Sequence, residues 1–377
     1  MEAEFSGRYL LTLAAMTVAG FILITGVVAI VNPFGLIRFA PTIPGINTAK
    51  VARNESDRLI KRYDPITLRP KTIIIGTSRV KFAFDPAKVG SVFAPAYNAG
   101  IDALSISEGQ QLLEGYLHDG IPIEHVFFEL FLFQFFHSWP GRQQEAPHGR
   151  DGAITDFLAT SFSGSAVRAA IETVRASLAS NVVVTRENGF RPIARPHNGV
   201  GFVPPQWLAS AKTQSEPSSD DEISSPKQPL SLLRDESFRD LEKIVEFCRA
   251  HNIDLRFFVS PLHPVFAQTQ GKVLLHEWLR RISVLPRVIS FLTTEQFRDY
   301  ELTRPKLYYS DYSHVSFAAA DLMIEDLMAY PNQRYGHVLN PNTLPRIIAE
   351  WDDQLSAWEQ LNPDFVQGFK AAMRSGK

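Results

Sequence analysis

The stretch Lys71-Thr-Ile-Ile-Ile-Gly-Thr-Ser-Arg79 decides which fold to expect. Its run of β-branched residues ends at Gly76, a pattern typical of a strand buried on both faces of a parallel sheet. Ligands of open α/β sheets bind beyond the carboxyl ends of the strands, so Ser78 lies where a reactive group is expected. A helix starting here would direct backbone N–H groups at an anion. The alternative is that Ser78 only caps that helix.

Further along the chain, short apolar runs alternate with segments of helical spacing. The runs at residues 125–130, 253–259 and 288–292 predict strands, and the segments at 105–117 and 238–251 predict helices. This alternation predicts an α/β fold in which helices flank a parallel sheet.

The N-terminal residues 9–31 form a run of 23 residues without a charge. As a helix the run is roughly 34 Å long, enough to cross a hydrocarbon core of about 30 Å. A buried core helix and a signal peptide cleaved after Ala29 are the alternatives. Signal peptides have apolar regions of about 7–15 residues, and cleavage at Ala29 would fall inside the run, so we expect an uncleaved anchor.

Composition divides the chain into a tail (1–8), the anchor (9–31), a linker with a lead-in helix (32–70), an α/β domain (71–335) and a C-terminal helical extension (336–377). Within the α/β domain, residues 209–229 contain almost no apolar side chains, which predicts a disordered insertion. Large C-terminal domains translocate largely regardless of flanking charge. We therefore expect a single-pass protein of the inner membrane with a cytoplasmic tail and a periplasmic domain.

Composition also argues against several function classes. The net charge of -2 and the lack of a basic run argue against nucleic-acid binding. Cys248 is the only cysteine, which excludes intramolecular disulfides and CxxC metal or redox motifs. No histidine or carboxylate cluster has the spacing of a metal site, so we expect no metal.

A second motif, Asp311-Tyr-Ser-His314, precedes a helical pattern at residues 315–330. The spacing of three lets the Asp311 carboxylate hold the Nδ1–H of His314 while Nε2 faces outward. These are the orienting acid and the base of a serine triad. The alternative is a helix N-cap aspartate with an unrelated surface histidine. With Ser78 after the first strand, the two motifs support each other.

Together the two motifs resemble the first and last conserved blocks of the SGNH/GDSL hydrolase superfamily. Tyr97-Asn-Ala-Gly-Ile101 is similar to the N-x-G segment of its second block. With an anchor, the chain is similar to membrane-anchored SGNH-like proteins of bacterial envelope and exopolysaccharide systems. These include relatives of the alginate O-acetylation proteins and of the protein that assists D-alanylation of teichoic acids. The resemblance covers residues 71–330 and implies an SGNH-like, flavodoxin-like parallel sheet.

The resemblance also implies an oxyanion hole, built from backbone N–H groups of Ser78 and of the turn that holds Gly100 and Ala103. Ala103 stands where the family has a glycine. The third-block G-x-N-D is absent, and Gln134 is the side-chain donor that would replace it. Glu129, amid phenylalanines at a strand end, is either a functional carboxylate or an ion-pair partner.

Two further candidates lie beside strand ends. Arg79 is either a ligand for an anionic sugar or carboxylate, or half of a salt bridge across the helix start. His263, in Ser260-Pro-Leu-His-Pro264, is either a substrate contact or a turn histidine.

These features predict a membrane-anchored SGNH-like serine O-acyltransferase or esterase that acts on O-acetyl groups of an envelope or extracellular polysaccharide. Its triad would be Ser78, His314 and Asp311, and its partners the polysaccharide, the membrane and a membrane acyltransferase or polysaccharide synthase. We expect no cofactor, since acyl transfer by a serine nucleophile needs none. The anchor favours transfer over hydrolysis, because it keeps the site near an emerging glycan. The alternative is a non-catalytic component with this fold in a polysaccharide acylation or export complex.

Overall fold

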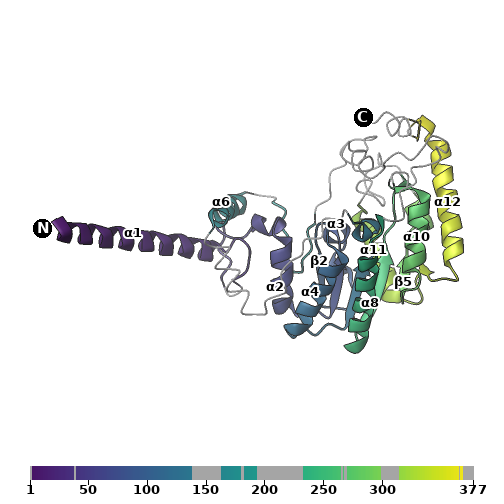
Figure 1. Ribbon diagram of the computed structural model, residues 1–377, viewed down its shortest axis with the longest axis horizontal. Helices are drawn as coiled ribbons and strands as arrows, with labels where there is room; N and C mark the ends of the chain where they lie inside the picture. Colours follow the sequence, from purple (N-terminus) through teal and green to yellow (C-terminus); the bar gives the residue numbers. More distant parts are fainter. Residues whose placement is uncertain are drawn as a thin grey trace.

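A long N-terminal helix projects from a globular α/β body in the computed structural model (Figure 1). The structure describes residues 2–37, 40–137, 163–179, 182–192, 232–264, 266, 270–298, 314–364 and 366–367. The insertion expected at 209–229 lies outside these residues.

The body is built on a six-stranded sheet with the order β2-β1-β3-β4-β5-β6. Strands β1 to β5 are parallel, and β6 is antiparallel to β5. The order 2-1-3-4-5 is that of flavodoxin-like doubly wound sheets, in which ligands bind where the winding reverses, between β1 and β3. The predicted parallel α/β sheet is confirmed. The strands are β1 (Thr72–Gly76), β2 (Ala96–Gly100), β3 (His125–Glu129), β4 (Asp254–Val259), β5 (Val288–Ser290) and β6 (His337–Leu339).

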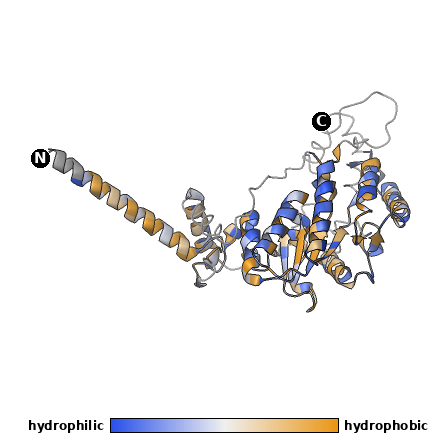
Figure 2. Ribbon diagram, turned by 60° about the horizontal axis from the view of Figure 1, so that its bottom comes forward, coloured by the Kyte–Doolittle hydropathy of each residue, from blue (hydrophilic) through white to orange (hydrophobic). Residues whose placement is uncertain are grey.

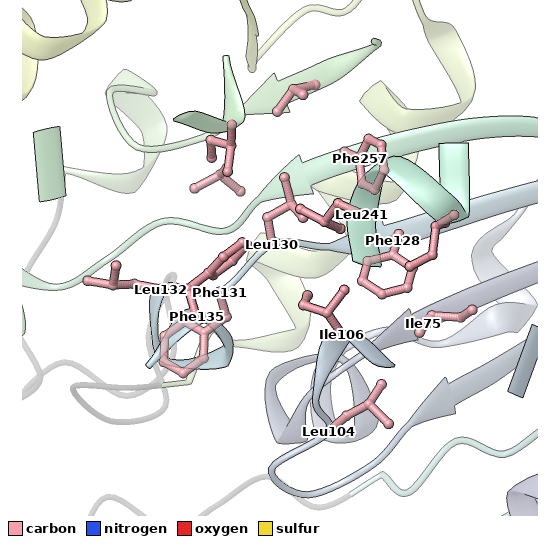
Figure 3. Close-up of a cluster of buried hydrophobic side chains, with 14 of the residues drawn as sticks. Ile75, Leu104, Ile106, Phe128, Leu130, Phe131, Leu132, Phe135, Leu241 and Phe257 are labelled. Atoms are coloured by element: carbon pink, nitrogen blue, oxygen red, sulfur yellow. The ribbon is translucent and has the colours of Figure 1, made fainter. Parts of the chain in front are cut away.

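Helices cover both faces of the sheet because alternate residues of each strand point to opposite sides. Ile73 and Ile75 join one apolar cluster with α4, α8, α10 and α12, and Ile74 joins a second with α3 and α11. In Figure 3, Ile75, Phe128 and Phe257 from three neighbouring strands lie together in the first cluster. The helices are α1 (Glu2–Val31), α2 (Asp57–Leu68), α3 (Ser78–Ala83), α4 (Ile106–His118), α6 (Gly164–Leu178), α8 (Asp235–Ala250), α10 (Lys272–Ile282), α11 (Phe317–Ala329) and α12 (Leu344–Leu361). Short 3-10 turns are η1 (Val51–Asn54), η2 (Pro86–Lys88), η3 (Leu132–Phe135) and η5 (Glu295–Phe297).

Helix α1 is apolar along most of its length (Figure 2). Its segment Arg8–Val31 is long and apolar enough to cross a membrane, and only 11% of its most apolar window is buried inside the protein. A helix that serves the core of a soluble protein would bury its apolar side chains, so the exposure favours the anchor over the core-helix alternative.

Residues 337–355 are part of the α/β body and not a separate extension. Strand β6 pairs with β5, and Leu339, Ile347 and Trp351 lie in the larger core cluster. The expected boundary between residues 335 and 336 is therefore wrong. A three-residue strand is too short to produce a period-two pattern, so the sequence alone could not reveal it.

Candidate active site

Ser78 and His314 meet at the carboxyl end of β1. Ser78 is the first residue of α3, and His314 lies shortly before α11. The Oγ atom of Ser78 is 2.9 Å from Nε2 of His314, although 236 positions separate the two residues in sequence. This distance is within the range for direct proton transfer between a hydroxyl and an imidazole. The expected contact between the two side chains is present.

Thr77, and not Ser78, caps helix α3. The hydroxyl of Thr77 accepts a hydrogen bond from the backbone N–H of Arg79 at 3.4 Å. The alternative in which Ser78 serves only as the N-cap is therefore wrong. With Thr77 in the capping position, the hydroxyl of Ser78 is left to face His314.

His314 is 8% exposed, and its imidazole lies edge-to-face against Phe82, with ring centroids 6.1 Å apart. This packing restricts the rotation of the ring and helps hold Nε2 toward Ser78. Asp311, the expected partner of Nδ1, lies outside the described residues, so its part in a triad stays a prediction.

A buried ion pair between Glu129 and Arg79 holds the turn between β1 and α3 in place. One carboxylate oxygen of Glu129 accepts hydrogen bonds from the backbone N–H and the hydroxyl of Thr77, both at 2.9 Å. The other is 3.1 Å from Nε of Arg79 and accepts a bond from the Ser260 hydroxyl at 3.0 Å. Both side chains are almost fully buried, at 2% and 0% exposure. Of the alternatives left open by the sequence, the ion pair is the one present.

The guanidinium of Arg79 is held by further contacts. It donates a hydrogen bond to the carbonyl of Pro261 at 2.5 Å and lies over the ring of Phe131. A guanidinium with these partners ties the ends of β1, β3 and β4 together. It is placed to hold the turn and not to meet a substrate anion.

Two glycines let β1, α3 and β2 approach closely. A Cβ atom at Gly76 would lie 2.3 Å from Cγ2 of Val80, and one at Gly100 would lie 2.3 Å from the backbone N of Lys81. The N–H of Gly100 donates to the Asn98 side chain at 2.8 Å. Gly100 is therefore not an oxyanion donor, because its N–H already has an internal acceptor.

The side chain of Asn98 fastens the end of α3. Its Nδ2 donates to the carbonyls of Val80 at 2.8 Å and Phe84 at 2.7 Å. The Val80 carbonyl also accepts from the backbone N–H of Phe84 at 3.1 Å, and Phe84 is the C-cap residue of α3. The N-x-G resemblance marked this residue, but its bonding partners depend on the packing of β2 against α3.

The turn at residues 101–104 lies beside Ser78. The N–H of Ile101 donates to the Gly76 carbonyl at 3.0 Å, and the N–H of Leu104 donates to the Ile101 carbonyl at 3.1 Å. Ala103 has φ +55°, the left-handed conformation that glycine adopts most readily. The turn therefore forms despite the alanine at this position.

Lys81, which the sequence analysis did not single out, anchors this turn to α3. Its ammonium is 2.9 Å from a carboxylate oxygen of Asp102 and forms a second ion pair with Asp57 of α2. The Lys81 side chain is 2% exposed. One lysine in a six-residue helix has no distinctive pattern, so only the structure reveals this role.

Gln134 supports the same turn and does not reach an oxyanion. Its Oε1 accepts from the N–H of Phe131 at 2.9 Å, and its Nε2 donates to the carbonyl of Leu104 at 3.1 Å. The residue is 0% exposed. The expectation that Gln134 is a free side-chain donor is therefore wrong, because its amide links η3 to the end of the turn.

His263 is buried against the C-terminal helix. It is 2% exposed, and its ring meets that of Trp358 in α12 edge-on, with centroids 6.0 Å apart. This placement favours a structural role for His263 over a contact with substrate.

Among the described residues, no group of three or more histidine, cysteine or carboxylate side chains is arranged to hold a metal ion. The chain matches no model of a known protein family, and comparison with curated proteins finds no significant match. The function is therefore inferred from the geometry of Ser78 and His314 and from the residues around them.

Proposed function

We propose that the protein is a membrane-anchored, SGNH-like serine O-acyltransferase or esterase that acts on O-acetyl groups of an envelope or extracellular polysaccharide. The observation that carries this proposal is the 2.9 Å separation between Ser78 Oγ and His314 Nε2 at the carboxyl edge of β1. A serine activated by a histidine is the usual nucleophile of acyl transfer.

In the proposed reaction, His314 removes the proton of the Ser78 hydroxyl while Oγ attacks the acyl carbon. The tetrahedral intermediate collapses, and His314 gives the proton to the departing alcohol, which leaves an acyl group on Ser78. Water or a sugar hydroxyl then loses a proton to His314 and attacks this ester, and His314 gives that proton to Ser78 Oγ as the acyl group leaves. Asp311 is proposed to hold the Nδ1–H of His314 throughout.

The oxyanion is proposed to bind two backbone N–H groups. That of Ser78 lies in the first turn of α3, where a helix has no acceptor for its N–H groups. The second comes from Ala103, at the tip of the turn that Lys81 and Gln134 hold in place. Backbone donors fixed in this way need no reorganisation when charge develops.

Three features support the SGNH assignment. The serine follows the first strand, the N-x-G segment lies on the neighbouring strand β2, and the histidine precedes a late helix. The anchor supports an envelope substrate and favours transfer to a sugar over transfer to water. The competing proposal is a non-catalytic assembly component, which is favoured by the loss of Gly100 and Gln134 as oxyanion donors.

The test uses full-length protein in detergent or nanodiscs with a fluorophosphonate probe and with an activated acetyl ester. We expect stoichiometric labelling at Ser78, and a rate that falls roughly 10⁴-fold in Ser78→Ala and His314→Ala. Ser91→Ala, at an exposed position, is the matched control and should leave the rate unchanged. Adding candidate oligosaccharides and following products by mass spectrometry separates the transferase from the esterase. No labelling of folded protein would favour the assembly component.

A further inference from the structure

Helix α6 packs across the end of the anchor helix (Figures 1 and 2). It belongs to the excursion between β3 and β4. Ala166 and Ala170 form a buried cluster with Val28 and Val31, the last turn of α1. Small side chains let the two helices approach closely.

This contact determines how deep α6 would lie in a membrane that α1 spans. The uncharged run at residues 9–31 is roughly 34 Å long as a helix, slightly more than a hydrocarbon core of about 30 Å. When α1 spans a bilayer, its last turn therefore lies at the boundary between acyl chains and headgroups. Helix α6, which packs against that turn, lies at the same depth.

The outer surface of α6 carries an aliphatic stripe with basic residues beside it. Val167, Ile171 and Leu178 are 37%, 48% and 74% exposed, and at 3.6 residues per turn they point within about 40° of one another. Arg168 and Arg175 are also exposed and lie beside the aliphatic stripe, with the exposed Glu172 on their outer side. The alanine face that meets α1 is separate from both.

We propose that α6 is an interfacial helix that lies in the surface of the bilayer. Its aliphatic stripe enters the acyl boundary, and Arg168 and Arg175 extend to lipid phosphates, as basic residues of amphipathic surface helices do. The occupant of the stripe is lipid because α6 packs against the last turn of α1, which also exposes apolar side chains. On that helix Val27 and Ile30 are 49% and 56% exposed.

Residues 185–188, which follow α6, form hydrogen bonds with the sheet and with η1. The carbonyl of Asn188 accepts a bond from the N–H of Asn98 in edge strand β2 at 2.9 Å. The N–H of Thr185 donates to the side chain of Asn54 at 2.9 Å. A second membrane contact at α6 thus fixes the orientation of the α/β body, because a single spanning helix leaves the body able to rotate about the helix axis.

The test places an NBD label at position 171 through Ile171→Cys, in nanodiscs that hold one copy of the full-length protein. Cys248, the only native cysteine, is 1% exposed and should not label. Val284→Cys is the matched control, since Val284 is 73% exposed and follows α10, far from α1 (Figure 1). Doxyl-labelled lipids should quench the label at position 171, and at position 167 in Val167→Cys, but not at position 284.

Equal quenching at positions 171 and 284 would overturn the proposal. Protection of position 171 from aqueous iodide without quenching by doxyl lipid would also overturn it, because the stripe would then face protein. Neither readout depends on catalysis, so the result stands apart from the outcome of the activity assays.

Discussion

Glu129 links the stability of the body to the geometry of the Ser78 turn. It bonds the backbone and the hydroxyl of Thr77 and forms an ion pair with Arg79 from which water is almost excluded. Charges in such a setting depend on their partner, because neither can be solvated when the other is removed.

We expect Glu129→Gln to lower the free energy of unfolding by about 3–5 kcal/mol, since it leaves the Arg79 guanidinium buried without a counter-charge. Urea denaturation measures the change. The control is Glu236→Gln, whose ion pair with Arg239 is exposed on both sides and whose loss should cost far less, because water solvates both charges. Similar losses in the two variants would contradict the structural role of Glu129.

Substitution of Ala103 is expected to raise the stability of the protein. Its φ of +55° is strained for any residue with a Cβ, so Ala103→Gly should stabilise the protein by about 1 kcal/mol. Ala349→Gly, at an exposed position inside α12, should instead destabilise it by about 0.5–1 kcal/mol. Thermal unfolding compares the two, and a loss of stability in both would show that the turn does not need the left-handed conformation.

At the scale of elements, helix α2 docks on edge strand β2 through a buried lysine. The ammonium of Lys61 donates to the carbonyl of Asn98 at 2.6 Å and also to that of Gly189. Gly189 has φ +80°, and a Cβ there would lie 2.1 Å from the same Asn98 carbonyl. The loop, the helix and the strand edge therefore pack around one cation. Burial lowers the pKa of Lys61 from its ordinary 10.5 to about 7.

This pKa predicts how stability depends on pH. Between pH 7 and 10.5 the unfolded chain keeps the Lys61 proton that the folded chain has lost, so the free energy of unfolding should rise with pH in this window. Between pH 7 and pH 9 the contribution of Lys61 is about 2 kcal/mol. Urea denaturation at the two pH values should show this increase in the wild type and in Lys243→Met, at an exposed lysine, but not in Lys61→Met. The same increase in Lys61→Met would assign it to another group.

At the scale of the whole molecule, α1 carries a large body on its C-terminal side. Because such domains translocate largely regardless of flanking charge, we expect the α/β body outside the inner membrane. A phosphatase reporter that folds only outside the cytoplasm, fused after Lys377, should be active. Activity only of a reporter that works in the cytoplasm would reverse the orientation.

The contact between Ser78 and His314 could be predicted because each residue belongs to a short motif whose place in the fold follows from the local sequence. An apolar run with a terminal glycine predicts a parallel strand, and a residue at its carboxyl end lies on the ligand-binding edge. Strand β2, in contrast, has the sequence Ala-Tyr-Asn-Ala-Gly, in which only the resemblance to the N-x-G segment was visible. Its polar Asn98 is tolerated in a buried strand because its side chain donates to the carbonyls of Val80 and Phe84 and accepts from the N–H of Gly100.

The sequence by itself determined the apolar N-terminal segment, the parallel α/β sheet and the position of Ser78, because periodicity and strand ends are local properties of the chain. Only the tertiary structure decided which polar groups already have a hydrogen-bond or ion-pair partner inside the protein. Gly100 and Gln134 were candidates for the oxyanion hole, and Glu129 for a functional carboxylate, yet all three bond to internal partners. A buried polar group must find a partner, and for Gln134 and Glu129 that partner is brought close only by packing of segments distant in sequence.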